Sequence, residues 1–182
     1  MSTLKLNLPT LLTLSRIVLI PVFVVTVHLH PIFGAIIFGI ASLTDFLDGY
    51  LARRSGEVTK FGIILDPIAD KFLIISALIV LVDIERLPAW IAIIIIAREF
   101  LVTGLRVVAL SKDIVIPAEM GGKFKTGFQI ASILCLILHG SLFDISPYGI
   151  TLYDIGIVLI WIALVLSIIS GVKYTISFGK MI

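Results

Sequence analysis

Residues 45–70 read DFLDGYLARRSGEVTKFGIILDPIAD and place four aspartates in two otherwise apolar segments. A carboxylate near the middle of a membrane-spanning helix costs roughly 2.5–3.5 kcal/mol, whereas a neighbouring Ile or Leu returns only about 0.3–0.6 kcal/mol. Four such groups therefore cost on the order of 10 kcal/mol before their mutual repulsion is counted. We infer that cations fill this cluster and that it forms a functional site.

The composition of the 182-residue chain is that of a membrane protein. Hydrophobic residues make up 59% of the chain and charged residues only 14%, against about 25% in soluble domains. The length predicts a single domain, residues 1–182. The one cysteine, Cys135, excludes an intrachain disulfide.

Six apolar segments have the length of about 20 residues that a helix needs to cross the hydrocarbon core. They are 11–29, 32–53, 60–82, 88–110, 124–142 and 152–173. Because the connections between them are short, we expect an all-α membrane protein, a six-transmembrane-helix bundle. The leucine-rich first dozen residues could add a short helix along the membrane surface.

The basic residues set the expected orientation of these segments. If the segments alternate in direction, all of the 14 Lys and Arg residues except Arg86 lie toward one side. The positive-inside rule places that side, together with both chain termini, in the cytoplasm. The aspartate cluster then opens toward the cytoplasm.

Helical spacing gathers the four aspartates. Asp45 and Asp48 share one face of the second segment, and Asp66 and Asp70 share one face of the third. Asp45 and Asp70 lie at similar depths, roughly 13–15 Å from the cytoplasmic helix ends, so antiparallel packing can bring the four carboxylates together. An all-oxygen site of this charge suits two hard divalent cations, Mg²⁺ or Mn²⁺.

The residues beside the aspartates favour a phosphate-bearing ligand. Gly49, Ala52 and Gly62 remove side-chain bulk on the same helix faces and leave room against the backbone. Arg53 adds a fixed, planar positive group near the cytoplasmic end of its helix, which suits a phosphate.

The chain resembles the CDP-alcohol phosphatidyltransferase family at all eight fixed positions of the family signature, which here reads Asp45-x2-Asp48-Gly49-x2-Ala52-Arg53-x8-Gly62-x3-Asp66-x3-Asp70. Segments 7–16, 96–106 and 122–126 are similar to the bacterial branch that uses glycerol 3-phosphate as acceptor. The resemblance therefore covers nearly the whole chain.

This resemblance implies a reaction and a setting. The reaction is phosphatidyl transfer from CDP-diacylglycerol to glycerol 3-phosphate, by attack on the β-phosphorus, giving phosphatidylglycerophosphate and CMP. The setting is the cytoplasmic (inner) membrane of a bacterium, where a multi-pass phosphotransferase works as a homodimer. The expected partners are the two substrates and membrane lipid, with no nucleic acid.

The resemblance also implies roles for individual residues. Asp45, Asp48 and Asp66 would hold one metal ion, while Asp45, Asp66 and Asp70 would hold the second. Asp70 is the expected base for the attacking hydroxyl. The residues expected to bind the CDP moiety are Gly49, Ala52, Arg53, Thr10 and Asn7.

Basic residues later in the chain are candidates for binding the phosphate of the acceptor. Arg98 follows an apolar run and is expected inside the bundle, where Glu99 or a phosphate would neutralise it. The full candidate set is Arg98, Arg106, Lys123 and Lys125. For Lys123 and Lys125 the positive-inside rule alone is an alternative explanation.

Two alternatives follow from the same residues. The chemistry could use another acceptor: phosphatidylglycerol, inositol phosphate or serine. A divalent-cation transporter would explain the aspartates, but not the glycines, alanine and arginine beside them. The outer halves of the six segments hold acidic residues only in or beside the loops, as at Asp154, which favours a one-sided pocket over a conduit.

Overall fold

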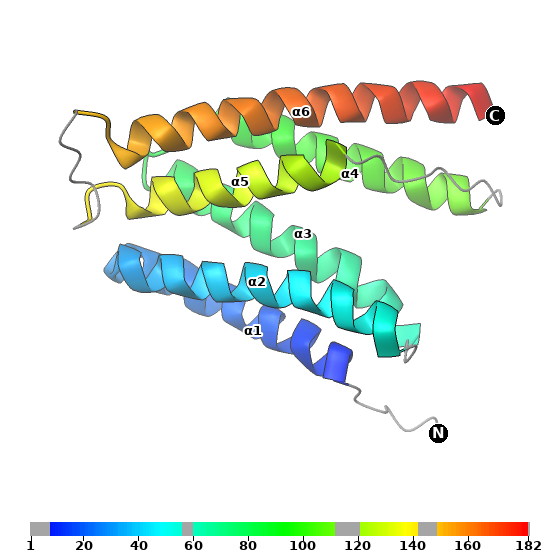
Figure 1. The fold of residues 1–182 in the computed structure, drawn as a ribbon, viewed down its shortest axis with the longest axis horizontal. Helices are drawn as coiled ribbons and strands as arrows, with labels where there is room; N and C mark the ends of the chain where they lie inside the picture. The colour runs from blue at the N-terminus through cyan, green and yellow to red at the C-terminus, as the bar shows by residue number, and fades with distance from the viewer. Residues whose placement is uncertain (1–7, 56–59, 112–120, 142–148, 182) are drawn as a thin grey trace. The chain divides into compact units, whose positions relative to one another are not determined.

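The structure is a computed structural model that describes the backbone of residues 8–55, 60–111, 121–141 and 149–181. It describes the side chains of residues 15–44, 71–109, 124–141 and 149–179. Within these residues the chain forms six α-helices and no strand, which confirms the all-α prediction (Figure 1). The helices are α1 (Leu8–Leu29), α2 (Pro31–Ser55), α3 (Lys60–Asp83), α4 (Ala89–Ser111), α5 (Gly121–Leu138) and α6 (Leu152–Met181).

Both chain ends differ from the expected segments. Helix α1 begins at Leu8 and runs without a break from there, so the described residues form no separate surface helix at the N-terminus. Residues 1–7 lie outside the described part of the chain. Helix α6 continues to Met181, past the apolar segment that ends at residue 173. A helix can outlast its apolar stretch because each of its hydrogen bonds is made within the helix itself.

The C-terminal end of α5 comes earlier than the expected residue 142 because other groups terminate it. Arg86 donates from Nη1 to the carbonyl oxygens of Leu136 (2.9 Å) and Ile137 (2.7 Å), which belong to the last turn of α5. Gly140 then takes a φ of +74°, the left-handed conformation that commonly follows a helix. Arg86 was the one basic residue expected on the outer side, and its role here is to cap α5.

The chain divides into two compact units, Met1–Val80 and Leu81–Ile182. The first unit contains α1, α2 and most of α3, and the second contains the end of α3 with α4, α5 and α6. The single domain expected from the sequence stays a prediction.

In the first unit, α1 and α2 pack together as an antiparallel hairpin (Figure 1). Phe23 and Phe38 are fully buried and their ring centroids lie 5.6 Å apart. Gly34 lets the two backbones approach, because a Cβ at this position would overlap Cγ2 of Val27 and stand 2.8 Å from its Cα. The absence of a side chain at Gly34 therefore determines how closely this hairpin closes.

In the second unit, α4 and α5 both pack against α6. Helix α4 runs parallel to α6 and α5 runs antiparallel to both (Figure 1). Ser132 donates to the carbonyl oxygen of Gly156 at 2.7 Å, and the rings of Trp90 and Trp161 meet edge to face at 5.5 Å. These contacts fix which faces of α4 and α5 turn toward α6.

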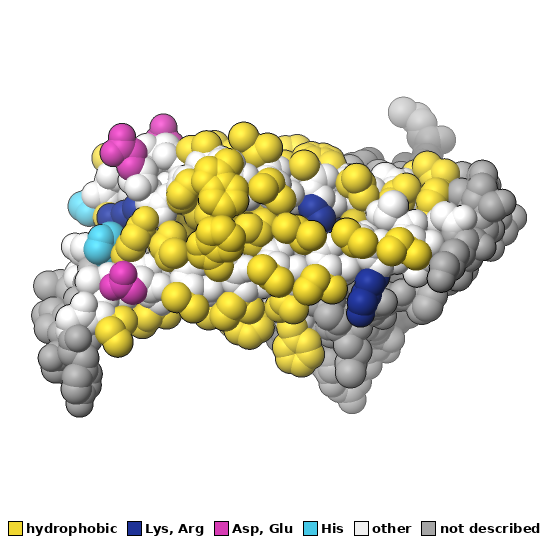
Figure 2. Space-filling model, turned by 90° about the horizontal axis from the view of Figure 1, so that it is seen from above, with side chains coloured by type: hydrophobic (Ala, Val, Ile, Leu, Met, Phe, Trp, Pro, Cys, Tyr) yellow, Lys and Arg dark blue, Asp and Glu magenta, His cyan; other side chains and the backbone are white. Residues whose placement is uncertain are grey.

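The outer surface of α6 is apolar along most of its length (Figure 2). Its exposed large side chains are Ile155, Val158, Trp161, Ile162, Val165, Ile168, Ile169, Val172 and Ile176. Soluble monomers rarely expose so continuous an apolar surface, whereas a lipid-facing helix does so by default. Among the described residues, one helix, Leu152–Gly179, is long and apolar enough to cross a membrane, and three shorter apolar helices accompany it. The six-span topology and the cytoplasmic termini stay predictions.

Candidate functional site

The four aspartates lie on two helices of the first unit. Asp45 and Asp48 belong to α2, and Asp66 and Asp70 belong to α3. Both segments are α-helical, as expected, and in a helix a spacing of three or four residues puts two positions on one face. The side chains of residues 45–70 lie outside the described side chains, so the metal site and its ligands stay predictions.

The site expected for the CDP moiety also stays a prediction. Gly49, Ala52 and Arg53 lie in the last turns of α2, and Thr10 lies in the first turn of α1, all without described side chains. Asn7 lies outside the described residues. Among the side chains that the structure does describe, no group of three or more His, Cys, Asp or Glu residues could hold a metal ion.

The second unit contains a charged cluster of Arg98, Glu99 and Lys125. Arg98 and Glu99 are neighbours on α4, and the guanidinium Nη1 lies 3.1 Å from Glu99 Oε1. Lys125 reaches the same carboxylate oxygen from α5. The three side chains are only 13%, 15% and 7% exposed. Arg98 was expected inside the bundle with Glu99 or a phosphate as its partner; in the structure it is mostly buried and pairs with Glu99, and its role toward a phosphate stays a prediction.

Arg98 also connects α4 to α6. Its Nε donates to the carbonyl oxygen of Ser167 at 2.8 Å, and its Nη2 donates to Ser170 Oγ at 2.7 Å. Gly171 leaves room for this approach, since a Cβ there would stand 3.2 Å from Arg98 Cγ and 3.3 Å from its Nε, closer than an ordinary contact. The Arg98–Glu99–Lys125 cluster therefore joins all three helices that pack together in this unit.

Within the cluster, two cations share one carboxylate oxygen. An arginine has five N–H donors, and hydrogen bonds to Ser167, Glu99 and Ser170 use three of those on Arg98. A mostly buried arginine with spare donors is suited to an anion, because charge-assisted hydrogen bonds gain strength away from water. The chemistry of the cluster is thus compatible with binding a phosphate.

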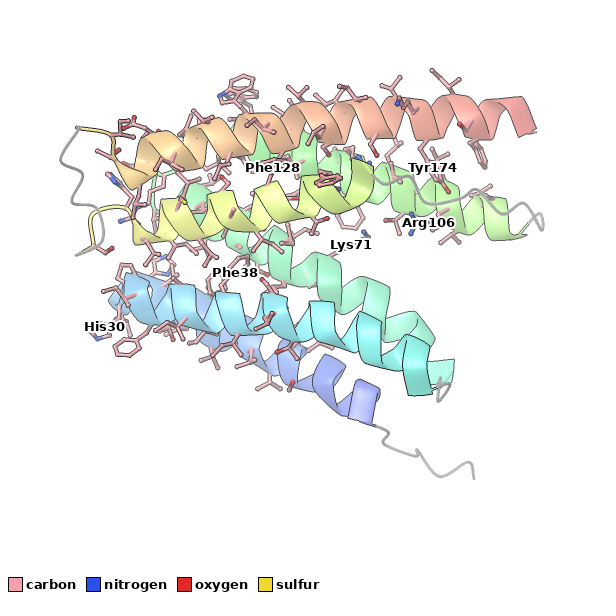
Figure 3. The ribbon with its side chains drawn as sticks, in the orientation of Figure 1. His30, Phe38, Lys71, Arg106, Phe128 and Tyr174 are labelled. Carbon is pink, nitrogen blue, oxygen red and sulfur yellow. The ribbon has the colours of Figure 1, made fainter. Side chains whose placement is uncertain are left out.

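The four basic residues expected around the acceptor do not all meet in the described structure. Arg98 and Lys125 come together through Glu99. Arg106 lies eight residues further along α4, about 12 Å along the helix axis, and is exposed (Figure 3). The side chain of Lys123 lies outside the described side chains.

Two further polar residues border the cluster and were absent from the predicted site. Gln129 lies one turn beyond Lys125 on α5 and is 3% exposed, and Ser167 on α6 is 1% exposed. In the sequence, Gln129 and Ser167 are each a polar residue inside an apolar segment. In a membrane protein such a residue usually indicates function or a contact between helices.

An apolar groove of about 400 Å³ lies between α4 and α6, beside the cluster. Arg98 is its one charged lining residue, among side chains such as Leu101, Ile168, Val172 and Ile176. The aliphatic part of Arg98 thus borders an apolar space, while its guanidinium group is held by the cluster.

Comparison with known proteins gives a family match over most of the chain. The family model of CDP-alcohol phosphatidyltransferase matches residues 6–169, which include parts of both units. A CDP-diacylglycerol–glycerol-3-phosphate 3-phosphatidyltransferase of Bacillus subtilis is 40% identical over 92% of this chain and 93% of its own length. A protein of the same name from Haemophilus influenzae is 38% identical over 93% of this chain and 92% of its own length. A probable phosphatidylglycerophosphate synthase of Mycobacterium tuberculosis is 39% identical over 92% of this chain and 79% of its own length.

Proposed function

The chain belongs to the CDP-alcohol phosphatidyltransferase family, and from this premise we propose that it makes phosphatidylglycerophosphate. The acceptor hydroxyl of glycerol 3-phosphate forms a bond to the β-phosphorus of CDP-diacylglycerol, the pyrophosphate bond breaks, and CMP leaves. The observation that carries this proposal is the 38–40% identity to relatives named for this reaction, over nearly their whole lengths in two of the three compared.

The aspartates of α2 and α3 fit a pair of hard divalent cations. Carboxylate oxygens are the ligands that Mg²⁺ and Mn²⁺ prefer, and the helical backbone carries these four at spacings that place each pair on one face. In our proposal Asp45, Asp48 and Asp66 hold one ion, and Asp45, Asp66 and Asp70 hold the other. When bound, such ions neutralise charge on the pyrophosphate and on the departing CMP.

The chain's own residues do the remaining work. Asp70 accepts the proton of the attacking hydroxyl. Gly49 and Ala52 leave space for the cytidine diphosphate, and Arg53 binds its phosphates. Asn7 and Thr10 border the same pocket.

The phosphate of the acceptor binds to basic residues of the second unit. The Arg98–Glu99–Lys125 cluster supports this assignment, because it brings together two cationic side chains that can donate charge-assisted hydrogen bonds to a phosphate. Neutral serine would offer these cations no phosphate to bind. Arg106 and Lys123 extend the positive charge toward the cytoplasmic ends of α4 and α5.

We also propose a six-span protein of the bacterial cytoplasmic membrane that assembles as a homodimer. The apolar outer surface of α6 and the placement of all Lys and Arg residues but Arg86 support the membrane topology. In this topology both termini and the active site face the cytoplasm.

The direct test is release of CMP by the purified protein in detergent. With CDP-diacylglycerol, glycerol 3-phosphate and Mn²⁺ or Mg²⁺, we expect CMP and phosphatidylglycerophosphate in equal amounts. A chelator should stop the reaction and fresh metal should restore it. Phosphatidylglycerol, inositol phosphate and serine serve as competing acceptors. If one of them reacts faster, the acceptor is wrong; if none releases CMP, the reaction class is wrong.

A further inference from the structure

Two buried polar groups lie beside the Arg98–Glu99–Lys125 cluster. Within the described part of the chain, the amide Nε2 of Gln129 and the hydroxyl Oγ of Ser167 have no hydrogen-bond partner. Gln129 lies four residues from Lys125 on α5, and Ser167 is the residue whose carbonyl oxygen accepts from Arg98. Each group therefore lies next to one of the two cations.

A buried amide that makes no hydrogen bond destabilises a protein, because it has lost its bonds to water without replacing them. The penalty is larger where lipid surrounds the protein, because water cannot supply the missing partner. Ser132, one turn from Gln129 on the same face of α5, does have a partner in Gly156. The helix packing thus satisfies Ser132 and leaves Gln129 with donors that a ligand could use.

We propose that Gln129 determines the specificity of the acceptor site by donating a hydrogen bond to a hydroxyl next to the acceptor's phosphate. This inference rests on the proposed function, because it takes glycerol 3-phosphate as the acceptor. Residues four apart on a helix are neighbours, with Cβ atoms about 5–6 Å apart. The 2-hydroxyl of glycerol 3-phosphate is on the carbon adjacent to the phosphate-bearing carbon. A phosphate at Lys125 therefore brings that hydroxyl within reach of the Gln129 side chain.

The expected benefit of such a contact is discrimination between acceptors. A site that contains a buried donor rejects a ligand that lacks the matching hydroxyl, because the donor then stays unpaired. The 1-hydroxyl, which attacks phosphorus, is left free by this arrangement. Gln129 thus affects which acceptor is used and takes no part in bond making.

The test compares two acceptors in the purified full-length enzyme. 3-Hydroxypropyl phosphate keeps the phosphate and the nucleophilic hydroxyl of glycerol 3-phosphate but lacks the 2-hydroxyl. We expect the native enzyme to prefer glycerol 3-phosphate by about tenfold or more in kcat/KM. Gln129→Met, which is similar in size and removes the unpaired donor, should abolish this preference by lowering kcat/KM for glycerol 3-phosphate alone.

The matched control is Ser132→Ala, on the same face of α5, which should keep the native preference. Gln129→Met should unfold at the native temperature or above it, since it removes a buried unpaired group. A Gln129→Met enzyme that keeps the native preference, or that loses activity with both acceptors in equal proportion, overturns the proposal. If the native enzyme releases CMP with neither acceptor, the proposed function itself fails.

Discussion

Arg98 on α4 donates a hydrogen bond from Nε to the backbone carbonyl of Ser167 on α6, over 2.8 Å. The same side chain reaches Ser170 on α6 and Glu99 on its own helix. Its orientation is therefore fixed before any ligand arrives. A phosphate that binds to a side chain already held in place loses less conformational entropy than one that must order a mobile arginine. Arg98 thus has a structural role in addition to its proposed part in acceptor binding.

Replacing Arg98 should affect both stability and acceptor binding. Arg98→Ala removes three hydrogen bonds from a mostly buried charged group, so we expect a loss of about 2–3 kcal/mol in the free energy of unfolding. The KM for glycerol 3-phosphate should rise more than the KM for CDP-diacylglycerol. Unfolding in detergent and steady-state kinetics measure these two effects. Arg106→Ala, at an exposed position on the same helix, should change stability by less than about 0.5 kcal/mol. Equal destabilisation of the two variants would contradict the structural role of Arg98.

The hairpin of α1 and α2 gives a prediction that compares two glycines on one helix. A Cβ at Gly34 would overlap the Val27 side chain and crowd its Cα, whereas a Cβ at Gly39 meets nothing within 4 Å. Gly34→Ala should therefore destabilise the protein by about 1–3 kcal/mol, because the two backbones must move apart. Gly39→Ala should stabilise it by about 0.5–1 kcal/mol, since alanine favours helix over glycine. Thermal unfolding followed by circular dichroism checks both, and shifts of the same sign would refute this packing.

Arg86 should matter for stability although it is not among the residues proposed for chemistry or binding. Its guanidinium satisfies two carbonyl groups at the end of α5, which have no partner within the helix. Arg86→Met keeps much of the side-chain length but leaves these carbonyls unpaired, so we expect a loss of about 1–3 kcal/mol in unfolding free energy. Glu85→Gln, at the exposed neighbouring position, is the control. Hydrogen exchange at the C-terminal turn of α5 should accelerate in Arg86→Met alone; unchanged exchange would argue against the cap.

The helices could be predicted from the sequence more accurately than their ends. Long apolar runs identify where each helix lies, because every membrane-spanning or buried helix needs about that length. The end of α5 depends on Arg86, which is 50 residues away from Leu136 in the chain, and no local pattern encodes such a contact. The end of α6 was missed for a different reason. Apolar residues indicate which part of a helix faces lipid or other apolar groups, but the backbone hydrogen bonds of the helix can continue beyond that part.

In the candidate site, too, some features could be predicted from spacing along the chain and others could not. The aspartates could be found because residues three and four apart share a helix face whatever the rest of the fold does. The Arg98–Glu99 pair was predictable for the same reason of proximity along the chain. The bond from Lys125 to Glu99, and the unpaired amide of Gln129, depend on how α5 is rotated against its neighbours. That rotation is a property of packing between helices, which the spacing of residues within one segment does not determine.

Asp70 should be needed for turnover but not for binding of CDP-diacylglycerol. Asparagine is nearly the same size as aspartate but cannot take up a proton, so Asp70→Asn should lower kcat by about 10²–10⁴-fold. Binding of CDP-diacylglycerol, measured in detergent without acceptor, should stay close to native. Asp83→Asn, at the exposed end of α3, should keep native activity.

Because Asp70 is also a proposed metal ligand, the assay is repeated over a wide range of Mn²⁺ concentrations. A lost ligand is compensated by more metal, whereas a lost base is not. Turnover that returns at high Mn²⁺ would therefore remove Asp70 from the role of base and leave it as a ligand alone.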